Sequence, residues 1–339
     1  MSAPEQHSAD HEPVEGLGEE IFAVRNLGVA YETNQGHVDA VSDVSLRLRR
    51  GEIMAVIGES GSGKSTLARG ILGLLPTGGR ITGGEVEIRL SEQPVSLVHS
   101  AGAVLRSLRG SGIGFVPQAT GGALNPVQRV SAHFRVTVKA HGISWEKQGR
   151  ALAERALAEA GLPATRQVMH AYPHELSGGM AQRVVVALAS VLEPSLLIAD
   201  EPTSALDVTV QRRLLDNLAA NVRRTRRGVI IITHDIRIAA HYCDSVLVMY
   251  GGYAVESGPV DAVLTAARHP YTRALLVAMP SNRERKRLPV RTGGTGSLSS
   301  TSRCPYYAEC PARTDPRCAA EVPPFAQVAP DHYVRSFYG

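Results

Sequence analysis

The sequence has no long hydrophobic run and little net charge, and each of these absences excludes a class of protein. A transmembrane helix needs about eighteen or more consecutive apolar residues, and no such run occurs. The formal net charge is only +4 at pH 7, whereas nucleic-acid-binding proteins concentrate basic residues on one face. We therefore expect neither a membrane-spanning helix nor a nucleic-acid partner.

The ends and the bulk of the chain differ in composition. Residues 1–20 are polar and acidic and lack the apolar core of a secretory signal, so we expect a disordered lead there. Hydrophobic residues make up 43% of the sequence, which is enough for a substantial core. No internal repeat is evident, so one copy of each motif below is expected.

A glycine-rich loop follows the apolar run Ile53–Ile57. Residues 58–65 read GESGSGKS and precede a stretch with helical character. In this P-loop pattern, backbone N–H groups and a helix N-terminus surround a phosphate chain. The lysine reaches the β- and γ-phosphates, and the hydroxyl of the following serine ligates Mg²⁺. The residues expected to bind a nucleoside triphosphate here are Gly58, Ser60, Gly61, Gly63, Lys64, Ser65 and Thr66.

Two further apolar runs end in residues that can act on a bound nucleotide. Leu196–Asp200 reads as a strand buried on both faces, and it is followed by Glu201. Asp200 is placed to hold Mg²⁺, and Glu201 to polarise the water that attacks the γ-phosphate. A second buried strand, Val229–Thr233, is followed by His234. Because ligands gather at the carboxyl ends of strands in open α/β sheets, these side chains are expected to converge on the P-loop.

The run LSGGM at residues 176–180 offers a second phosphate-binding helix N-terminus. Ser177, Gly178 and Gly179 precede a helical stretch that extends to Leu192. The P-loop of one chain already binds the phosphates of one ATP. The second helix N-terminus is therefore expected to face the ATP bound by another subunit.

With these motifs in this order, the chain resembles the nucleotide-binding subunit of an ABC transporter. The resemblance implies an α/β fold with a P-loop ABC ATPase core, an antiparallel β layer, an α-helical insertion subdomain and a short cysteine-containing C-terminal tail. It implies that Glu201, His234 and Gln118 are catalytic and that Gln118 joins Ser65 and Asp200 at Mg²⁺. It also implies that residues 177–180 are the signature, that residues 204–207 are the D-loop and that Tyr31 stacks on adenine, with hairpin packing as the alternative for Tyr31.

Three further segments resemble one branch of this family, the ATPase subunits of oligopeptide, dipeptide and nickel importers. They are Asn125–Val127, DEPTSALDVTVQ at 200–211 and HPYTRALL at 269–276. The resemblance implies ATP hydrolysis that drives uptake of peptides, or of nickel or metal chelates, through a membrane permease. The alternative is a non-transport ABC ATPase acting on ribosomes or DNA, which would carry two cassettes or a long coiled coil; neither pattern is present.

The same resemblance implies partners, a location and a division of the chain. The partners are a second ATP-binding subunit, identical or paralogous, two transmembrane permease subunits and, indirectly, an extracytoplasmic solute-binding protein. The location is peripheral, at the cytoplasmic face of the cell membrane. Residues 21–265 are expected to form the nucleotide-binding domain, with a helical subdomain at about 125–182, and residues 266–339 a C-terminal extension.

Three cysteines, Cys304, Cys310 and Cys318, lie in a proline-rich tail that we expect to be poor in strands. A glycine- and serine-rich linker at 291–302 precedes it. Cytosolic chains rarely use disulfides, so clustered thiols in a chain expected at the cytoplasmic face favour a metal site. The resemblance adds a [4Fe–4S] cluster, which needs four ligands. Ser336 and His332 are the candidates for the fourth, and a Cys₃His zinc site or no metal are the alternatives. Cys243 is expected in the core.

Overall fold

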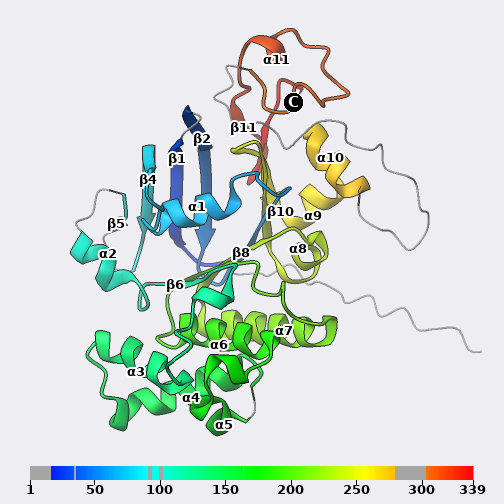
Figure 1. Ribbon diagram of the computed structural model, residues 1–339. Coiled ribbons are helices and arrows are strands. Elements are labelled where there is room, and N and C mark those ends of the chain that lie inside the picture. The colour runs from blue at the N-terminus through cyan, green and yellow to red at the C-terminus, as the bar shows by residue number, and fades with distance from the viewer. Residues whose placement is uncertain are drawn as a thin grey trace, which may run out of the picture.

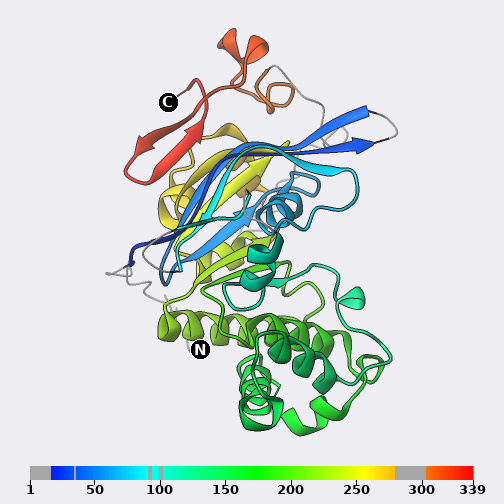
Figure 2. The same ribbon diagram turned by 90° about the vertical axis from the view of Figure 1, so that its left-hand side faces the viewer.

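The computed structural model describes residues 17–33, 36–90, 94–98, 102–162, 164–278 and 303–338. Within them the chain forms two β-sheets (Figure 1). A group of helices lies at one end of the molecule and the C-terminal segment at the other. Figure 2, turned by 90°, shows the same separation of these two parts.

The larger sheet runs in the order β11-β12-β10-β9-β3-β8-β7-β6. Its parallel part contains β3 (Ile53–Ile57), β6 (Ile113–Val116), β7 (Leu196–Asp200), β8 (Gly228–Thr233) and β9 (Ser245–Tyr250). Strands β3, β7 and β8 are buried along their whole length, as expected for parallel strands covered on both faces. The carboxyl ends of these strands meet at one edge of the sheet.

The C-terminal tail extends this sheet with a β-hairpin. β10 (Tyr253–Pro259) runs antiparallel to β9 and pairs on its other side with β12 (His332–Arg335), which pairs with β11 (Phe325–Ala329). The described residues 304–318, which carry the three cysteines, contain no strand, as expected, but the hairpin that follows them was not predicted from the sequence. The hairpin forms because Val334 is buried against β10 and Asp331, at a φ of +52°, makes the turn between the two strands.

The smaller sheet is antiparallel, as predicted, in the order β2-β1-β4-β5. It consists of β1 (Glu20–Thr33), β2 (Gly36–Arg49), β4 (Gly79–Ile88) and β5 (Val95–Ser96). Its apolar face shares a core with the larger sheet and with α1 (Lys64–Ile71), where Phe22, Met54 and Leu67 are buried together. Glu20, the last residue of the expected lead, already belongs to β1; residues 1–16 lie outside the described part.

The helical part lies between β6 and β7 in the sequence. It contains α3 (Val130–Ala140), α4 (Arg150–Glu159), α5 (Thr165–His170) and α6 (Gly178–Ser190), with a π-helical turn (Trp145–Gly149) and short 3₁₀ turns (Thr120–Gly122 and Pro173–Glu175). Helix α4 ends before Gly161, which has a φ of +78°. Phe134 and Leu157 are buried in the same core cluster as Leu197 of the sheet, so the helices and the sheet share one core.

The remaining helices follow the sheet strands or precede the tail hairpin. They are α2 (Gly102–Leu108), α7 (Val208–Thr225), α8 (Ile236–Tyr242), α9 (Val260–Thr265), α10 (Pro270–Val277) and α11 (Arg317–Ala320). Among the helices that the structure describes, none is both long enough and apolar enough to cross a bilayer. The linker predicted at 291–302 lies outside the described residues.

Candidate nucleotide-binding site

The P-loop connects β3 to α1 in a conformation that two of its glycines make possible. Gly58 and Gly63 have φ values of +153° and +100°, which L side chains rarely adopt. A Cβ on Gly58 would collide with the carbonyl oxygen of Met249 on β9, and one on Gly63 would lie 2.5 Å from that of Ala40 on β2. The loop is therefore packed closely between the two sheets.

Lys64, the first residue of α1, turns its ammonium back into this loop. The side chain is buried, and Nζ donates hydrogen bonds to the carbonyl oxygens of Gly58 (2.8 Å) and Glu59 (2.7 Å) and to Ser62 Oγ (3.2 Å). Burial lowers the pKa of Lys64, and the charges of Glu201 and Asp200 oppose this shift. The loop thus holds a positive charge at its centre, as phosphate binding requires.

Asp200, at the end of β7, has the environment of a magnesium ligand. Its side chain is buried, which raises its pKa, and a hydrogen bond from Ser65 opposes that shift. Among the described residues, Oδ1 of Asp200 has no hydrogen-bond partner. A buried carboxylate oxygen without a partner is costly unless a cation or a donor satisfies it. Because Mg²⁺ prefers oxygen ligands, Asp200 and Ser65 fit this ion.

Glu201 and His234 meet at the same edge of the sheet. Nδ1 of His234 lies 2.7 Å from Oε1 of Glu201, and the imidazole N–H donates to the carboxylate. Glu201 is buried, whereas the His234 side chain is 73% exposed. The backbone of Glu201 is in the left-handed region, with a φ of +52°. Such strain in a non-glycine residue is common at functional sites. Glu201 and His234 therefore form a hydrogen-bonded pair of carboxylate and imidazole at this edge.

The signature lies apart from this group. Ser177 caps α6, and its Oγ accepts a hydrogen bond from the backbone N–H of Met180 (3.2 Å). Ser177 and Gly178 are exposed, and a Cβ on Gly179 would lie 3.1 Å from Leu206 in the D-loop. Within the described residues, no hydrogen bond or ion pair joins the signature to the P-loop of the same chain. The signature therefore presents exposed residues at the start of α6.

Gln118 and Tyr31 lie at the margin of the site. Gln118 is exposed, two residues beyond the end of β6. Tyr31 is partly exposed on β1, pairs with Val38 on β2, and packs its ring against Gly79. In the part of the chain that the structure describes, no hydrogen bond or ion pair joins either side chain to the P-loop, so their roles toward Mg²⁺ and adenine stay predictions.

Comparison with known proteins decides the family. Residues 41–204 match the family model described as ABC transporter, and residues 255–318 match that of the oligopeptide/dipeptide transporter C-terminal region. The oligopeptide transport ATP-binding protein OppD of Lactococcus lactis subsp. cremoris is 40% identical over 264 residues, which are 78% of this chain and 77% of that protein. The chain belongs to the ABC transporter family.

Other members of the family agree with this assignment. The glutathione import ATP-binding protein GsiA of Salmonella choleraesuis is 40% identical over 263 residues, which cover 77% of this chain but 42% of that protein. The chain thus matches less than half the length of this relative. Two dimeric structures of the cassette MJ0796, one of them a post-hydrolysis state bound to ADP and Pi, give TM-scores of 0.64 and 0.63. Both are 26% identical and cover 71% of this chain and 99% of the other. The predicted ABC ATPase fold is confirmed.

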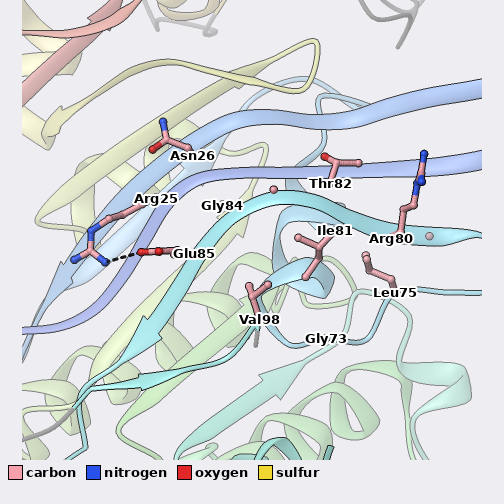
Figure 3. A pocket seen from close by; sticks show the side chains of 12 residues that line it. Arg25, Asn26, Gly73, Leu75, Arg80, Ile81, Thr82, Gly84, Glu85 and Val98 are labelled. Atoms are coloured by element: carbon pink, nitrogen blue, oxygen red, sulfur yellow. Dashed lines mark ion pairs between the residues drawn. The ribbon is translucent and has the colours of Figure 1, made fainter. Parts of the chain in front are cut away.

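Two depressions of this ABC protein have no nucleotide-site residue in their lining. One of about 1000 Å³ lies on the antiparallel sheet between β1 and β4 (Figure 3). The Arg25 guanidinium there is 3.9 Å from the Glu85 carboxylate, so its charge is already paired. This depression is separate from the site built around Lys64.

Three polar residues near the site were not predicted from the sequence. Gln182, on α6, is buried, and its amide is 3.5 Å from the Glu201 carbonyl oxygen. Ser62 contributes the hydroxyl that accepts from Lys64, and the Tyr271 hydroxyl accepts from the P-loop backbone. Gln182 could have been singled out in the sequence, because it is a lone glutamine within the apolar helix 178–190. No local pattern pointed to Tyr271.

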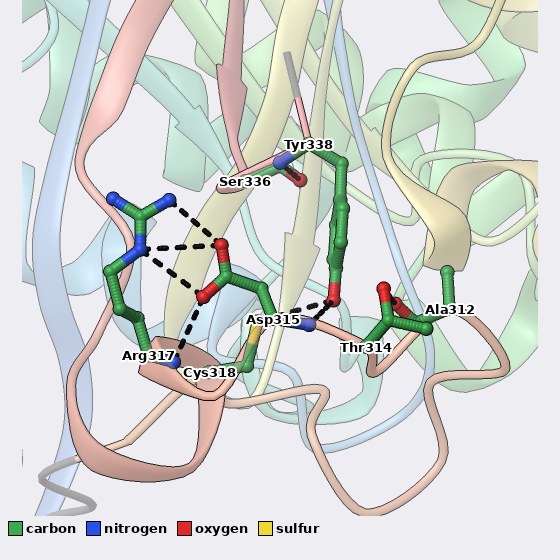
Figure 4. Close-up of polar contacts among 7 residues, drawn as sticks. All are labelled: Ala312, Thr314, Asp315, Arg317, Cys318, Ser336 and Tyr338. Carbon is green, nitrogen blue, oxygen red and sulfur yellow. Dashed lines mark hydrogen bonds and ion pairs between the residues drawn. The ribbon is translucent and has the colours of Figure 1, made fainter.

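The three tail cysteines lie together in a small buried cavity. Cys304, Cys310 and Cys318 line it with His269 and Ser336, and the Cys304 backbone N–H donates to the Cys318 carbonyl. Burial raises the pKa of Cys304 to about 11, which favours the neutral thiol. Figure 4 shows Cys318 beside Tyr338, whose hydroxyl lies 3.8 Å from Sγ.

The cavity does not fit the metal sites suggested for it. Among the described residues, no group of three or more histidine, cysteine or acidic side chains has the arrangement of a metal site. His332 is not a candidate ligand, because its Nε2 is hydrogen-bonded to Glu256 at 2.8 Å and its strand places it outside the cavity. The iron–sulfur and zinc interpretations therefore find no support. Cys243 is fully buried in the core, as predicted.

Proposed function

We propose that this chain is the ATP-hydrolysing subunit of a membrane importer, and that the imported solutes are peptides or related small molecules. The observation that carries the proposal is the meeting of Lys64, Asp200 and Glu201 at the carboxyl edge of one parallel sheet. Phosphoryl transfer depends on positioning and charge neutralisation more than on covalent chemistry. This edge supplies a cation, two carboxylates and backbone N–H groups.

Each of these residues has a separate role in the proposed reaction. Lys64 binds the β- and γ-phosphates. Ser65 and Asp200, with Gln118, would hold a Mg²⁺ ion, which would neutralise the phosphate charge. Glu201 orients the attacking water and accepts its proton. His234 donates its imidazole N–H to Glu201 and so fixes the direction of that carboxylate (2.7 Å). Tyr31 stacks on the adenine. The remaining phosphate contacts come from Gly58, Ser60, Gly61, Gly63 and Thr66.

The proposed reaction needs two subunits. The exposed signature residues Ser177, Gly178 and Gly179 complete the site of a second ATP-binding subunit, identical or paralogous, because they do not reach the P-loop of their own chain. The dimeric MJ0796 cassette supports this arrangement. Closure over ATP, and opening after hydrolysis, would move the helical part between β6 and β7.

The proposed partners and domains follow from the family. Two permease subunits bind the chain at the inner face of the membrane, and an extracytoplasmic protein delivers the solute to them. Residues 21–265 form the nucleotide-binding domain, with its helical subdomain at about 125–182, and residues 266–339 form the extension. No [4Fe–4S] cluster is included, because three thiols and the Ser336 hydroxyl do not make its usual ligand set.

The choice of a peptide-type solute rests on the C-terminal region. Residues 255–318 match the oligopeptide/dipeptide transporter model, and the relatives OppD and GsiA are named for oligopeptide transport and glutathione import. Nickel and metal chelates remain alternatives from the sequence. A role on ribosomes or DNA has no observation in its favour.

Uptake measurements test this proposal. Cells lacking the chain are complemented with wild type, Glu201→Gln or the exposed control Glu321→Gln, and are given labelled dipeptides, oligopeptides, glutathione or nickel. Peptide or glutathione uptake restored by wild type and Glu321→Gln, but not by Glu201→Gln, supports the proposal. Restored nickel uptake alone would contradict the solute class. Equal rescue by Glu201→Gln would contradict the role of ATP hydrolysis.

A further inference from the structure

Tyr271, in the C-terminal region, is hydrogen-bonded to the P-loop. It is the second residue of α10 and is 2% exposed. The backbone N–H of Glu59 donates to its hydroxyl over 3.0 Å, although the two residues are 212 positions apart in the sequence. A segment outside the P-loop and its sheet thus contacts the nucleotide-binding loop directly.

The contacted peptide group is the one that also holds Lys64. The Gly58 carbonyl and the Glu59 N–H belong to the same peptide unit, which is planar and rotates as one body. Its carbonyl oxygen accepts from Lys64 Nζ at 2.8 Å, and its N–H donates to Tyr271. Both ends of this unit are therefore fixed. A rotation that broke the Tyr271 bond would also displace the oxygen that positions the Lys64 ammonium.

The Tyr271 ring is itself held by two other tyrosines. Its centroid is 4.6 Å from that of Tyr250, at the end of β9, and 5.5 Å from that of Tyr306 in the tail. Tyr250 and Tyr306 pack edge to face at 5.1 Å, and the Tyr250 hydroxyl donates to Glu309 at 3.0 Å. Burial raises the pKa of Tyr271, so its hydroxyl stays protonated. The tail therefore encloses the side chain that contacts the P-loop.

The start of α10 is fixed as firmly as the ring. His269 caps the helix, and its Nδ1 accepts from the Tyr271 backbone N–H at 3.1 Å. The His269 backbone N–H donates to the buried carboxylate of Glu256 on β10 at 3.0 Å. The position and direction of Tyr271 are thus set by the larger sheet, whose strand β3 leads into the P-loop.

We infer that Tyr271 is a positioning residue for the nucleotide site, and that the C-terminal region uses it to hold the Gly58–Glu59 peptide in the orientation that places Lys64 against phosphate. The inference rests on the proposed ATPase function. It assigns the extension a direct part in nucleotide binding, in addition to any part in transport.

The test compares Tyr271→Phe with Tyr250→Phe in the full-length chain. Both variants keep an aromatic ring in the same cluster and lose one buried hydroxyl, but only Tyr271 reaches the P-loop. ATP affinity is measured by equilibrium binding with Mg²⁺ present, amide exchange is followed for a peptide containing Glu59, and the thermal midpoint is recorded. Tyr271→Phe is expected to weaken ATP binding about threefold to tenfold, the effect of one hydrogen bond. Exchange at Glu59 should accelerate.

The control separates positioning from general stability. Tyr250→Phe is expected to keep wild-type ATP affinity and Glu59 exchange, even where its thermal midpoint falls as far as that of Tyr271→Phe. Equal affinities for the two variants, whether both unchanged or both reduced, would overturn the inference and leave the proposed function standing. Absence of ATP binding by the wild-type chain would overturn both.

Discussion

Glu256 is a buried carboxylate on which three segments of the C-terminal half converge. It is fully buried on β10. Oε1 accepts from the Arg268 backbone N–H and from His332 Nε2, both at 2.8 Å, and Oε2 accepts from the His269 backbone N–H at 3.0 Å. One side chain therefore joins β10, the segment before α10, and β12. We expect its removal to destabilise the whole C-terminal region.

The size of the effect follows from the number of donors. A hydrogen bond to a charged group contributes about 1.5–3 kcal/mol. Glu256→Gln replaces one acceptor oxygen by an NH₂ group, which faces at least one N–H donor, so we expect a loss of about 2 kcal/mol. Glu256→Ala leaves all three donors without this acceptor, and we expect about 4–5 kcal/mol, as for other broken buried pairs.

Urea unfolding and limited proteolysis measure this prediction in the full-length chain. The exposed Glu321→Gln serves as the control and should unfold like the wild type. Cleavage after residue 265 should accelerate in the order wild type, Glu256→Gln, Glu256→Ala. ATP affinity should also fall in Glu256→Ala, because His269 caps the helix that carries Tyr271. A Glu256→Ala variant within about 0.5 kcal/mol of wild type would refute the reasoning, since that is the range of surface substitutions.

Three further predictions concern the site and the sheet. Lys64→Ala should weaken ATP binding at least about tenfold, because it removes the charge at the centre of the loop; unchanged affinity in a binding titration would contradict the P-loop assignment. Glu201→Gln should bind ATP like the wild type, lose about 100-fold or more in hydrolysis rate, and accumulate ATP-bound dimers on size exclusion; normal turnover would contradict its role. Burial raises the pKa of Glu52 above its usual value of 4.5. The folded state therefore binds more protons than the unfolded state above pH 4.5, and the free energy of unfolding falls as pH rises through the raised pKa. Glu52→Gln should flatten this fall in unfolding experiments between pH 4.5 and 8, and an unchanged pH profile would assign the dependence to other groups.

The structural elements around the site that were predicted correctly from the sequence are those with a local pattern. A buried parallel strand is a short apolar run, so Leu196–Asp200 and Val229–Thr233 were predicted nearly residue by residue. Because parallel strands end at one edge, the meeting of Asp200 with the P-loop followed as well. Each of these predictions needs only neighbouring residues and a general rule of sheet geometry.

The tail was predicted less well because its structure depends on distant partners. Residues 325–335 form a hairpin only where β10 offers an edge, and nothing within that segment identifies β10 as the partner. His332 looked like a ligand because of its nearness in sequence to the cysteines. In the structure, β12 directs the His332 side chain to Glu256. The register of a strand predicts such a contact only once its partner strand is known.

The sequence by itself determined the chemistry that we propose for the site, because a phosphate loop, a carboxylate pair and a histidine each need particular residue types at short spacing. Tertiary structure alone decided what holds that chemistry in place. The bond from Glu59 to Tyr271 joins residues 212 positions apart. The buried acceptor Glu256 receives three hydrogen bonds from two separate segments, the one before α10 and β12. Such contacts are fixed by the packing of the whole sheet. A single hydroxyl or carboxylate belongs to no periodic sequence pattern from which its partner could be predicted.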